Sequence, residues 1–272
     1  MTASSAGSNA APVEIIDGRL DAGVLLLCDH AANAMPAEYG SLGLPPDAFG
    51  RHIAYDIGAA GVTRRLARLL HCPAVLTTFS RLLIDPNRGA DDPTLIMRIS
   101  DGAIVPGNAH LSAEEIERRR RLYWQPYRDQ VSAVLNDMQA AGFVPAVIAI
   151  HSFTPAWKGH PRPWHVGILW DADDRLARPT ITALKADDEL VVGDNEPYDG
   201  ALEGDSMYHH GTMRGLPHML LEIRQDLVPE PGGEVAWAER LACILPPILA
   251  DPGLHTVKHF GTRTQAFTSH AG

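Results

Sequence analysis

Hydrophobic residues gather in short runs that are bounded by turn-forming residues along most of the chain. Apolar runs of this length are typical of strands that are buried on both faces of a sheet. We therefore expect strands at residues 24–28, 74–78, 82–85, 146–150, 166–170, 190–192 and 219–223.

Between these runs, apolar residues recur at helical spacing. A helix is expected at 56–70. A longer helix begins after Ser112, which forms a capping-box pattern with Glu115, and ends at Gly142. Pro126 is expected to kink this helix, because proline lacks the amide hydrogen that the helix requires. Two more helices are predicted, at 174–185 and 234–249.

Alternation of strands and helices predicts an α/β fold in which a mainly parallel, mixed sheet carries helices on both faces, as in phosphorylase- or hydrolase-like proteins. No linker divides the chain, so we expect one domain over 13–272 and a flexible N-terminal tail over 1–12. Two long loops rich in proline and glycine, 89–110 and 153–163, are candidate lids. Ligands of such folds usually bind at the carboxyl ends of the strands.

Composition narrows the classes of function. The chain of 272 residues has a formal charge of -10, which argues against a nucleic-acid partner. No apolar run approaches the roughly 20 residues that cross a bilayer, so no membrane association is expected. Three cysteines follow no disulfide or metal motif, which favours a reducing compartment and a cytoplasmic location. The sequence carries no information on the oligomeric state.

Two expected strands end in a histidine, which makes these residues candidate metal ligands. His30 follows the run 24–28, and His151 follows the run 146–150. If the two strands are neighbours, both imidazoles converge, and neutral imidazole is the commonest metal ligand in proteins. Asp56 is the nearest carboxylate that could complete the set. Packing or capping histidines, and an aspartate that interacts with a helix dipole, are the alternatives.

The segment 80–89 gathers cationic and amide side chains. Arg81, Asn87 and Arg88 lie on it, and the planar guanidinium of Arg88 suits bidentate capture of a substrate carboxylate. A structural salt bridge from Arg88 to Asp85 or Asp91 is the alternative.

Glu222 is a carboxylate inside an apolar run. Burial of such a charge costs on the order of several kcal/mol unless the charge is paired. Glu222 is therefore either a partner of Arg224 or another cation, or a functional general base.

Taken together, these motifs resemble the N-formylglutamate amidohydrolase family, which is more distantly similar to zinc carboxypeptidases and aspartoacylases. The resemblance extends from His30 to Glu222. Its most specific elements are Asp85-Pro86-Asn87-Arg88 and His151-Ser152, and weaker ones are Asn195-Glu196-Pro197-Tyr198 and His209-His210-Gly211. The chain departs from the relatives at Asn33, where the peptidases place a glutamate ligand, and this departure leaves Asp56 as the preferred third ligand.

The resemblance implies an enzyme of amino-acid degradation that hydrolyses a linear amide. Its substrate would be a small N-acyl acidic amino acid, with N-formyl as the expected acyl group, such as N-formylglutamate, which yields formate and glutamate. Zinc or another divalent ion would be held by His30, Asp56 and His151, with Glu222 as general base. Substrate would be bound by Asn87 and Arg88, with Arg81 or His210 stabilising the developing oxyanion.

Other classes of protein fit the sequence less well. A serine hydrolase of the nucleophile-elbow type would carry Gly-x-Ser-x-Gly, and a nucleotide-binding enzyme would carry a glycine-rich phosphate loop; neither motif is present. Two alternatives remain open, a protein that binds a small acidic ligand without catalysis, and a metallohydrolase of the carboxypeptidase or aspartoacylase kind.

Overall fold

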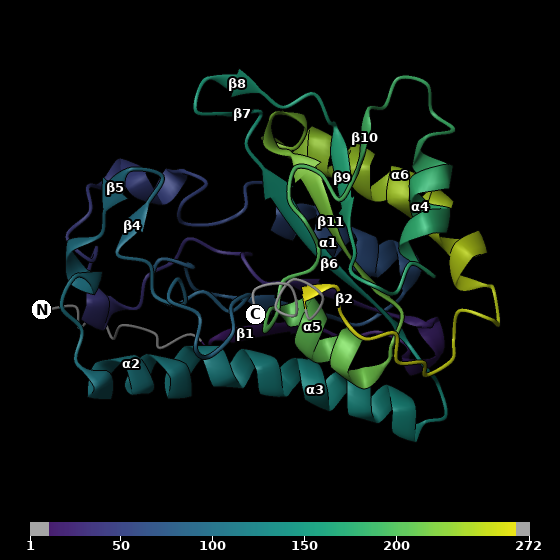
Figure 1. Cartoon of the computed structure of the whole chain (residues 1–272), viewed down its shortest axis with the longest axis horizontal. Helices are drawn as coiled ribbons and strands as arrows, with labels where there is room; N and C mark the ends of the chain where they lie inside the picture. Colours follow the sequence, from purple (N-terminus) through teal and green to yellow (C-terminus); the bar gives the residue numbers. More distant parts are fainter. Residues whose placement is uncertain (1–10, 265–272) are drawn as a thin grey trace, which may run out of the picture.

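The computed structural model of the chain describes residues 11–264 and has a seven-stranded mixed sheet at its centre (Figure 1). The strands lie in the order β1-β3-β2-β6-β11-β9-β10, and neighbours run parallel except at β1–β3 and β11–β9. Their bounds are β1 Val13–Ile16, β2 Val24–Cys28, β3 Ala74–Thr77, β6 Ala146–Phe153, β9 Val166–Leu169, β10 Val192–Asp194 and β11 His218–Arg224. The predicted α/β class with a mainly parallel sheet is confirmed.

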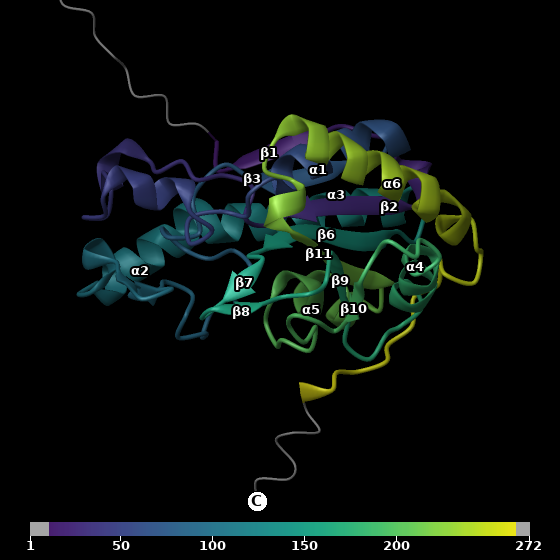
Figure 2. The same ribbon diagram turned by 90° about the horizontal axis from the view of Figure 1, so that it is seen from above.

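Helices cover both faces of this sheet. One face packs against α1 (Ala59–Leu70), α4 (Ala177–Leu184) and α6 (Pro231–Leu249), and Figure 2 shows α1 and α6 side by side. The other face packs against α3 (Gln125–Ala140) and α5 (Ser206–His210). Helix α2 (Ala113–Arg119) continues into α3 through a π-helical turn, Arg120–Trp124. Single 3-10 turns lie at Leu20–Ala22, Ala37–Tyr39, Pro46–Gly50, Pro106–Asn108, Thr212–Arg214 and Gln225–Leu227.

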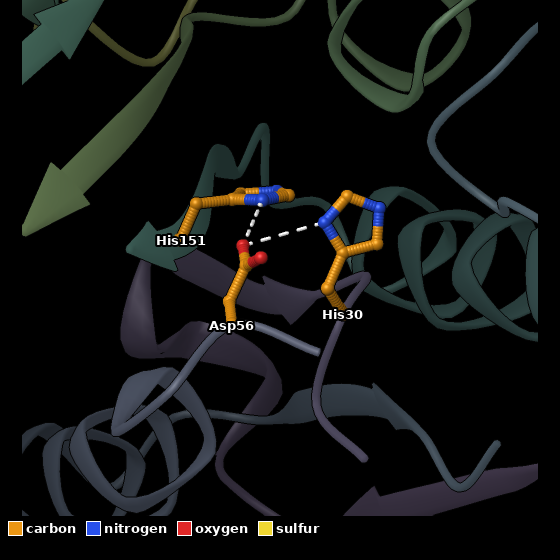
Figure 3. Close-up of side chains that lie close together, drawn as sticks. All are labelled: His30, Asp56 and His151. Atoms are coloured by element: carbon orange, nitrogen blue, oxygen red, sulfur yellow. Dashed lines mark hydrogen bonds and ion pairs between the residues drawn. The ribbon is translucent and has the colours of Figure 1, made fainter. Parts of the chain in front are cut away.

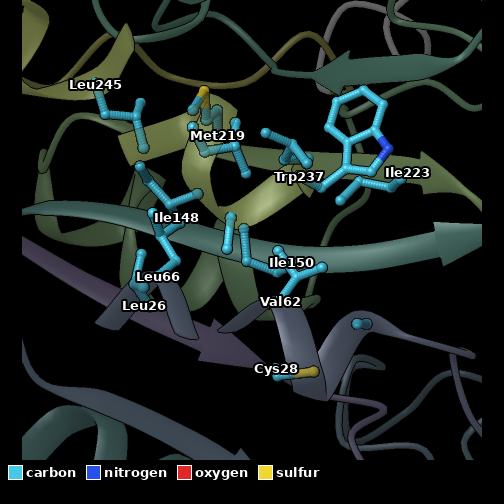
Figure 4. Close-up of a cluster of buried hydrophobic side chains, with 14 of the residues drawn as sticks. Leu26, Cys28, Val62, Leu66, Ile148, Ile150, Met219, Ile223, Trp237 and Leu245 are labelled. Carbon is cyan, nitrogen blue, oxygen red and sulfur yellow. The ribbon is translucent and has the colours of Figure 1, made fainter. Parts of the chain in front are cut away.

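The core consists of two layers because successive strand residues point to opposite faces. Leu26, Ile148 and Met219 point toward α1 and α6 (Figure 4). Their sequence neighbours Leu25 and Val147 point toward α3. Each fully buried side chain of this kind contributes about 1.5–3 kcal/mol from removal of apolar surface from water. Burial on both faces explains why the central strands are continuous apolar runs rather than alternating ones.

One predicted strand is wrong. Residues 82–85 form turns, in which the amide of Leu83 donates to the carbonyl of Ser80 and the amide of Asp85 donates to the carbonyl of Leu95. Leu82, Leu83 and Ile84 are nevertheless fully buried, because they fill two small apolar clusters beneath the loops. This short apolar run therefore indicates that the residues are buried, but it does not indicate which secondary structure they form.

The long helix has the predicted start, and a π-helical turn interrupts it directly before Pro126. The hydroxyl of Ser112 accepts a hydrogen bond from the amide of Glu115 at 3.1 Å, as a capping residue does. Pro126 lies in the first turn of α3, directly after the π-helical turn, rather than inside a continuous α-helix. The chain ends α3 at Ala140, and Gly142 then adopts the left-handed conformation expected of a helix terminator.

Two hairpins stand on the loops that were predicted to be lids. They are β4 (Ile99–Ser100) with β5 (Ala103–Ile104), and β7 (Ala156–Trp157) with β8 (His160–Pro161). Figure 1 shows β7–β8 beyond the carboxyl end of β6.

At the N-terminus, Ala11 and Pro12 of the predicted tail accept hydrogen bonds from Thr78, and residues 1–10 lie outside the described part. Over residues 11–264, no helix has the length and apolar character that spanning a membrane requires.

Candidate active site

A cavity of about 310 Å³ lies at the carboxyl ends of β6 and β11. Its position agrees with the rule that ligands of α/β sheets bind at this edge. Seven of the eight site residues predicted from the sequence line it: His30, Asp56, Arg81, Asn87, Arg88, His151 and Glu222. The structure thus brings together side chains from five separate segments of the chain.

The two strand-end histidines meet at Asp56 (Figure 3). Strands β2 and β6 are neighbours, so the ends of both strands lie side by side. Asp56 Oδ2 lies 2.8 Å from Nδ1 of His151 and 3.3 Å from Nδ1 of His30. All three side chains are buried, and they offer ligand atoms within 4.8 Å of one another. Two imidazoles and a carboxylate are the protein ligands of many catalytic zinc sites.

The outer nitrogen of each imidazole also contacts a buried carboxylate. Nε2 of His30 lies 2.7 Å from Asp85, and Nε2 of His151 lies 2.9 Å from Asp29. Metal-binding histidines commonly have such a carboxylate behind them, because it fixes the tautomer and the orientation of the ring. Neither role was predicted from the sequence, although Asp29 directly precedes His30 and Asp85 opens the motif Asp85-Pro86-Asn87-Arg88.

The electrostatics of the group favour a bound cation. Asp29, Asp56 and Asp85 are all at most 5% exposed. Burial opposes their ionisation, yet the neighbouring histidines lower the pKa of Asp56 and, with Arg81, hold the pKa of Asp85 well below its usual value. Burial likewise opposes protonation of His151, but its bonds to Asp29 and Asp56 raise its pKa well above the usual value. Positive charge between these carboxylates is therefore strongly stabilised.

Arg81 contacts two of these carboxylates, Asp85 and Asp56. Its Nη2 donates to Asp85 at 2.6 Å, and its Nη1 lies 3.6 Å from Asp56. Two close anions neutralise much of its charge, so Arg81 acts as a structural partner of the acidic group even though it lines the cavity.

Arg88 differs, because no carboxylate pairs with it in residues 11–264. The predicted alternative, a bridge to Asp85 or Asp91, is not formed. Its guanidinium donates to Thr94 Oγ1 and to the carbonyl of Asn87. The side-chain oxygen of Asn87 accepts from the amide of Ser206 at 2.9 Å, which turns the NH₂ group of Asn87 toward other partners. Arg88 and Asn87 therefore offer unused donors at the cavity.

Glu222 stands beside the histidine cluster on the same face of the sheet. Its register partner on β6 is His151, and it is 7% exposed. Arg224 pairs with Asp226 instead, so the structural alternative for Glu222 is not realised. Among residues 11–264, Oε2 of Glu222 has no hydrogen-bond partner. Burial raises the pKa of Glu222 to about 7. Such a carboxyl group is suited to accept and return a proton near neutral pH.

His210 is the predicted site residue that the structure does not bring to the cavity. It is fully buried on α5, and neither of its ring nitrogens has a hydrogen-bond partner in the part of the chain that the structure describes. Burial lowers its pKa well below the usual value. The neighbouring Ser206 instead reaches the site, because its hydroxyl donates to Asp29 behind His151.

Fold and site together define an α/β protein with a carboxylate and histidine cluster at the carboxyl ends of its central strands. The family described as N-formylglutamate amidohydrolase matches residues 22–228, which is most of the chain. The chain belongs to this family and is a hydrolase that acts on an amide bond.

Two solved structures are similar to this chain over 88% of its length. A gene product of Agrobacterium tumefaciens is 34% identical, is covered over 95% of its own chain, and has a TM-score of 0.84. An N-formylglutamate amidohydrolase of Ralstonia eutropha JMP134 is 20% identical, is covered over 97% of its chain, and has a TM-score of 0.67. The second likeness supports the fold. None of the curated proteins matches the chain.

Proposed function

We propose that the protein is a metal-dependent hydrolase of a small N-acyl amino acid, with an N-formyl acidic amino acid such as N-formylglutamate as the preferred substrate. The observation that carries this proposal is the group formed by His30, Asp56 and His151 in one cavity with Glu222 and the unpaired Arg88. The name of the Ralstonia eutropha neighbour indicates the same acyl group.

The residues fit a divalent ion, and zinc in particular. Nδ1 of both histidines and an oxygen of Asp56 face one another, and Asp85 and Asp29 lie behind the rings. The surplus of buried negative charge is a second reason, because an unbalanced group of this kind is costly to bury. When bound, the ion supplies a Lewis acid that acidifies water and polarises the acyl carbonyl.

Glu222 carries the proton transfers. It accepts a proton from the attacking water as the water oxygen forms a bond to the acyl carbon. It then donates this proton to the amide nitrogen as the carbon–nitrogen bond breaks. For an N-formyl amino acid the products are formate and the free amino acid. General acid–base catalysis of this kind typically contributes about 10²–10⁴-fold to a rate.

Arg88 and Asn87 hold the carboxylate of the substrate. Arg88 has no ion pair of its own in the described part of the chain, and its planar guanidinium matches a carboxylate in shape. Fixing the carboxylate there would orient the amide over the histidine cluster, so that binding energy is used for positioning. The partner is thus a small acidic molecule. Because Cys28, Cys72 and Cys243 are all free thiols, we place the enzyme in the reducing cytoplasm.

A substrate screen tests this function. Protein loaded with zinc is incubated with N-formyl and N-acetyl amino acids, and release of the free amine is measured. We expect turnover of N-formyl acidic amino acids and little turnover when the α-carboxylate is replaced by a carboxamide. Arg88→Lys should lower kcat/KM for the carboxylate substrate but not for the carboxamide. Absence of hydrolysis across the whole panel would contradict the proposal.

A further inference from the structure

The register of the sheet places three residues in a row on one face. His151 on β6 pairs with Glu222 on β11, and Glu222 pairs with Gly167 on β9. Residues that pair across neighbouring strands point to the same face. The row therefore runs from the histidine cluster to the carboxylate and then to a position without a side chain.

The gap at Gly167 is filled by a turn that carries Tyr198. A Cβ at Gly167 would lie 1.9 Å from the carbonyl oxygen of Glu196, and one at Gly193 would lie 2.6 Å from the same atom. The side-chain oxygen of Asn195 accepts hydrogen bonds from the amides of Trp170 and Gly200 at 2.9 and 3.1 Å. The turn is thus packed directly on the sheet beside Glu222, and Tyr198 lines the same cavity as Glu222.

Arg162 orients the hydroxyl of Tyr198. Nη1 of Arg162 donates to that hydroxyl at 3.0 Å and to Thr154 Oγ1 at 3.2 Å. Its guanidinium also lies over three rings that line the cavity, at 5.0 Å from Tyr198, 5.5 Å from Trp157 and 5.7 Å from Phe153. No carboxylate pairs with Arg162 within residues 11–264. Because the phenol oxygen accepts from a cation, its own O–H is available to donate into the cavity.

The acyl oxygen of the substrate gains negative charge in the transition state, and a donor from the protein would stabilise this charge together with the ion. The two donors predicted from the sequence are poorly placed, since Arg81 is held between Asp85 and Asp56, and His210 does not line the cavity. Preorganised donors that face a developing oxyanion are among the largest contributions to acyl-transfer rates. The turn that carries Tyr198 packs against Gly167, which pairs with Glu222 on the side away from His151, and Tyr198 lines the same cavity. Tyr198 is therefore a candidate donor to the oxygen of an acyl group that is attacked beside Glu222.

We propose that Tyr198 is a catalytic residue whose hydroxyl donates a hydrogen bond to the carbonyl oxygen of the scissile amide, and that Arg162 is the residue that positions it. This inference rests on the proposed amide hydrolysis. Burial raises the pKa of Tyr198, and the charge of Glu222 adds to the effect, so the phenol keeps the proton that it must donate.

Removal of the hydroxyl alone tests the assignment. Tyr198→Phe should lower kcat by about 10²–10³-fold, the range known for loss of one oxyanion donor, while KM changes by less than about threefold. Bound zinc per protein should stay unchanged. Tyr39→Phe is a matched control, because Tyr39 also accepts a hydrogen bond from an arginine, Arg118, but does not line the cavity. Its kcat should equal that of the unsubstituted enzyme.

The positioning role of Arg162 has a separate readout. Arg162→Ala should lower kcat in the unsubstituted enzyme but have little further effect in the Tyr198→Phe background, since both changes remove the same interaction. A kcat within threefold of normal for Tyr198→Phe, or a loss that lies wholly in KM, would overturn the proposal while leaving the amidohydrolase function intact. If the unsubstituted enzyme hydrolyses no N-acyl amino acid, both proposals fail.

Discussion

At the scale of single residues, the candidate site consists of buried polar side chains whose protonation and orientation are set by their neighbours. Glu222 is buried and forms no ion pair within residues 11–264, and burial raises the pKa of its carboxyl group to about 7. The histidines are oriented from behind by Asp29 and Asp85. Each of these side chains would be costly to bury in a protein that had no use for it.

Glu222→Gln separates a catalytic from a structural role. The amide has nearly the same shape but cannot accept the proton, so we expect kcat to fall by about 10²–10⁴-fold. Zinc content and the melting temperature should stay close to those of the unsubstituted enzyme. All three quantities are measured on one preparation, with Glu230→Gln on the surface before α6 as the control. Near-normal turnover with a lowered melting temperature would instead assign Glu222 to the structure.

Much of the residue-scale chemistry could be predicted from the sequence, because histidines and a carboxylate at the ends of apolar runs stand out. The carboxylates behind the histidines could not, since they depend on contacts between residues that are 55 and 122 positions apart. The same limit explains His210: its motif was visible, but which way α5 turns it was not.

At the scale of elements, the sheet register sets the order of the chemical groups. The alignment of β6, β11 and β9 puts His151, Glu222 and Gly167 in one row. Strand positions were predictable because both faces of the central strands are buried and therefore apolar. The segment 82–85 has the same apolar pattern but fills loop clusters, and β1 at the edge of the sheet, with one exposed residue among four, lacks the pattern.

A substitution at Gly167 tests whether this order of groups depends on how the turn that carries Tyr198 packs against the sheet. In Gly167→Ala the new Cβ would meet the carbonyl of Glu196, so the turn that carries Tyr198 must move. We expect a loss of about 1–3 kcal/mol in the free energy of unfolding, as for other overpacked sites, together with a lower kcat. Denaturant unfolding and steady-state kinetics measure the two effects.

Gly232→Ala is the matched control for this substitution. Gly232 lies in α6, and a Cβ there would meet nothing within 4 Å. Alanine is the better helix former, so this variant should be at least as stable as the unsubstituted enzyme and fully active. Equal stability and equal kcat in both variants would show that the turn does not depend on the gap at Gly167.

At the scale of the whole molecule, the candidate site forms only when the whole sheet has folded. His30, Asp56, residues 81–88, His151 and Glu222 come from segments that only the completed sheet and its loops bring together. The family and the fold class could be predicted, since they follow from motifs and alternating elements. The cavity shape, the hairpin β7–β8 beside it and the role proposed for Tyr198 required the assembled chain.

The central claim is that the His30, Asp56 and His151 group holds a metal ion on which amide hydrolysis depends. The most direct measurement is a titration of chelator-treated protein with zinc, in which release of amine from an N-formyl acidic amino acid is followed at each step. We predict no turnover without metal and a rise that saturates at about one equivalent, as for a single catalytic site. His151→Ala should neither bind this equivalent nor recover activity. Full turnover by metal-free protein, or normal zinc binding by His151→Ala, would contradict the account.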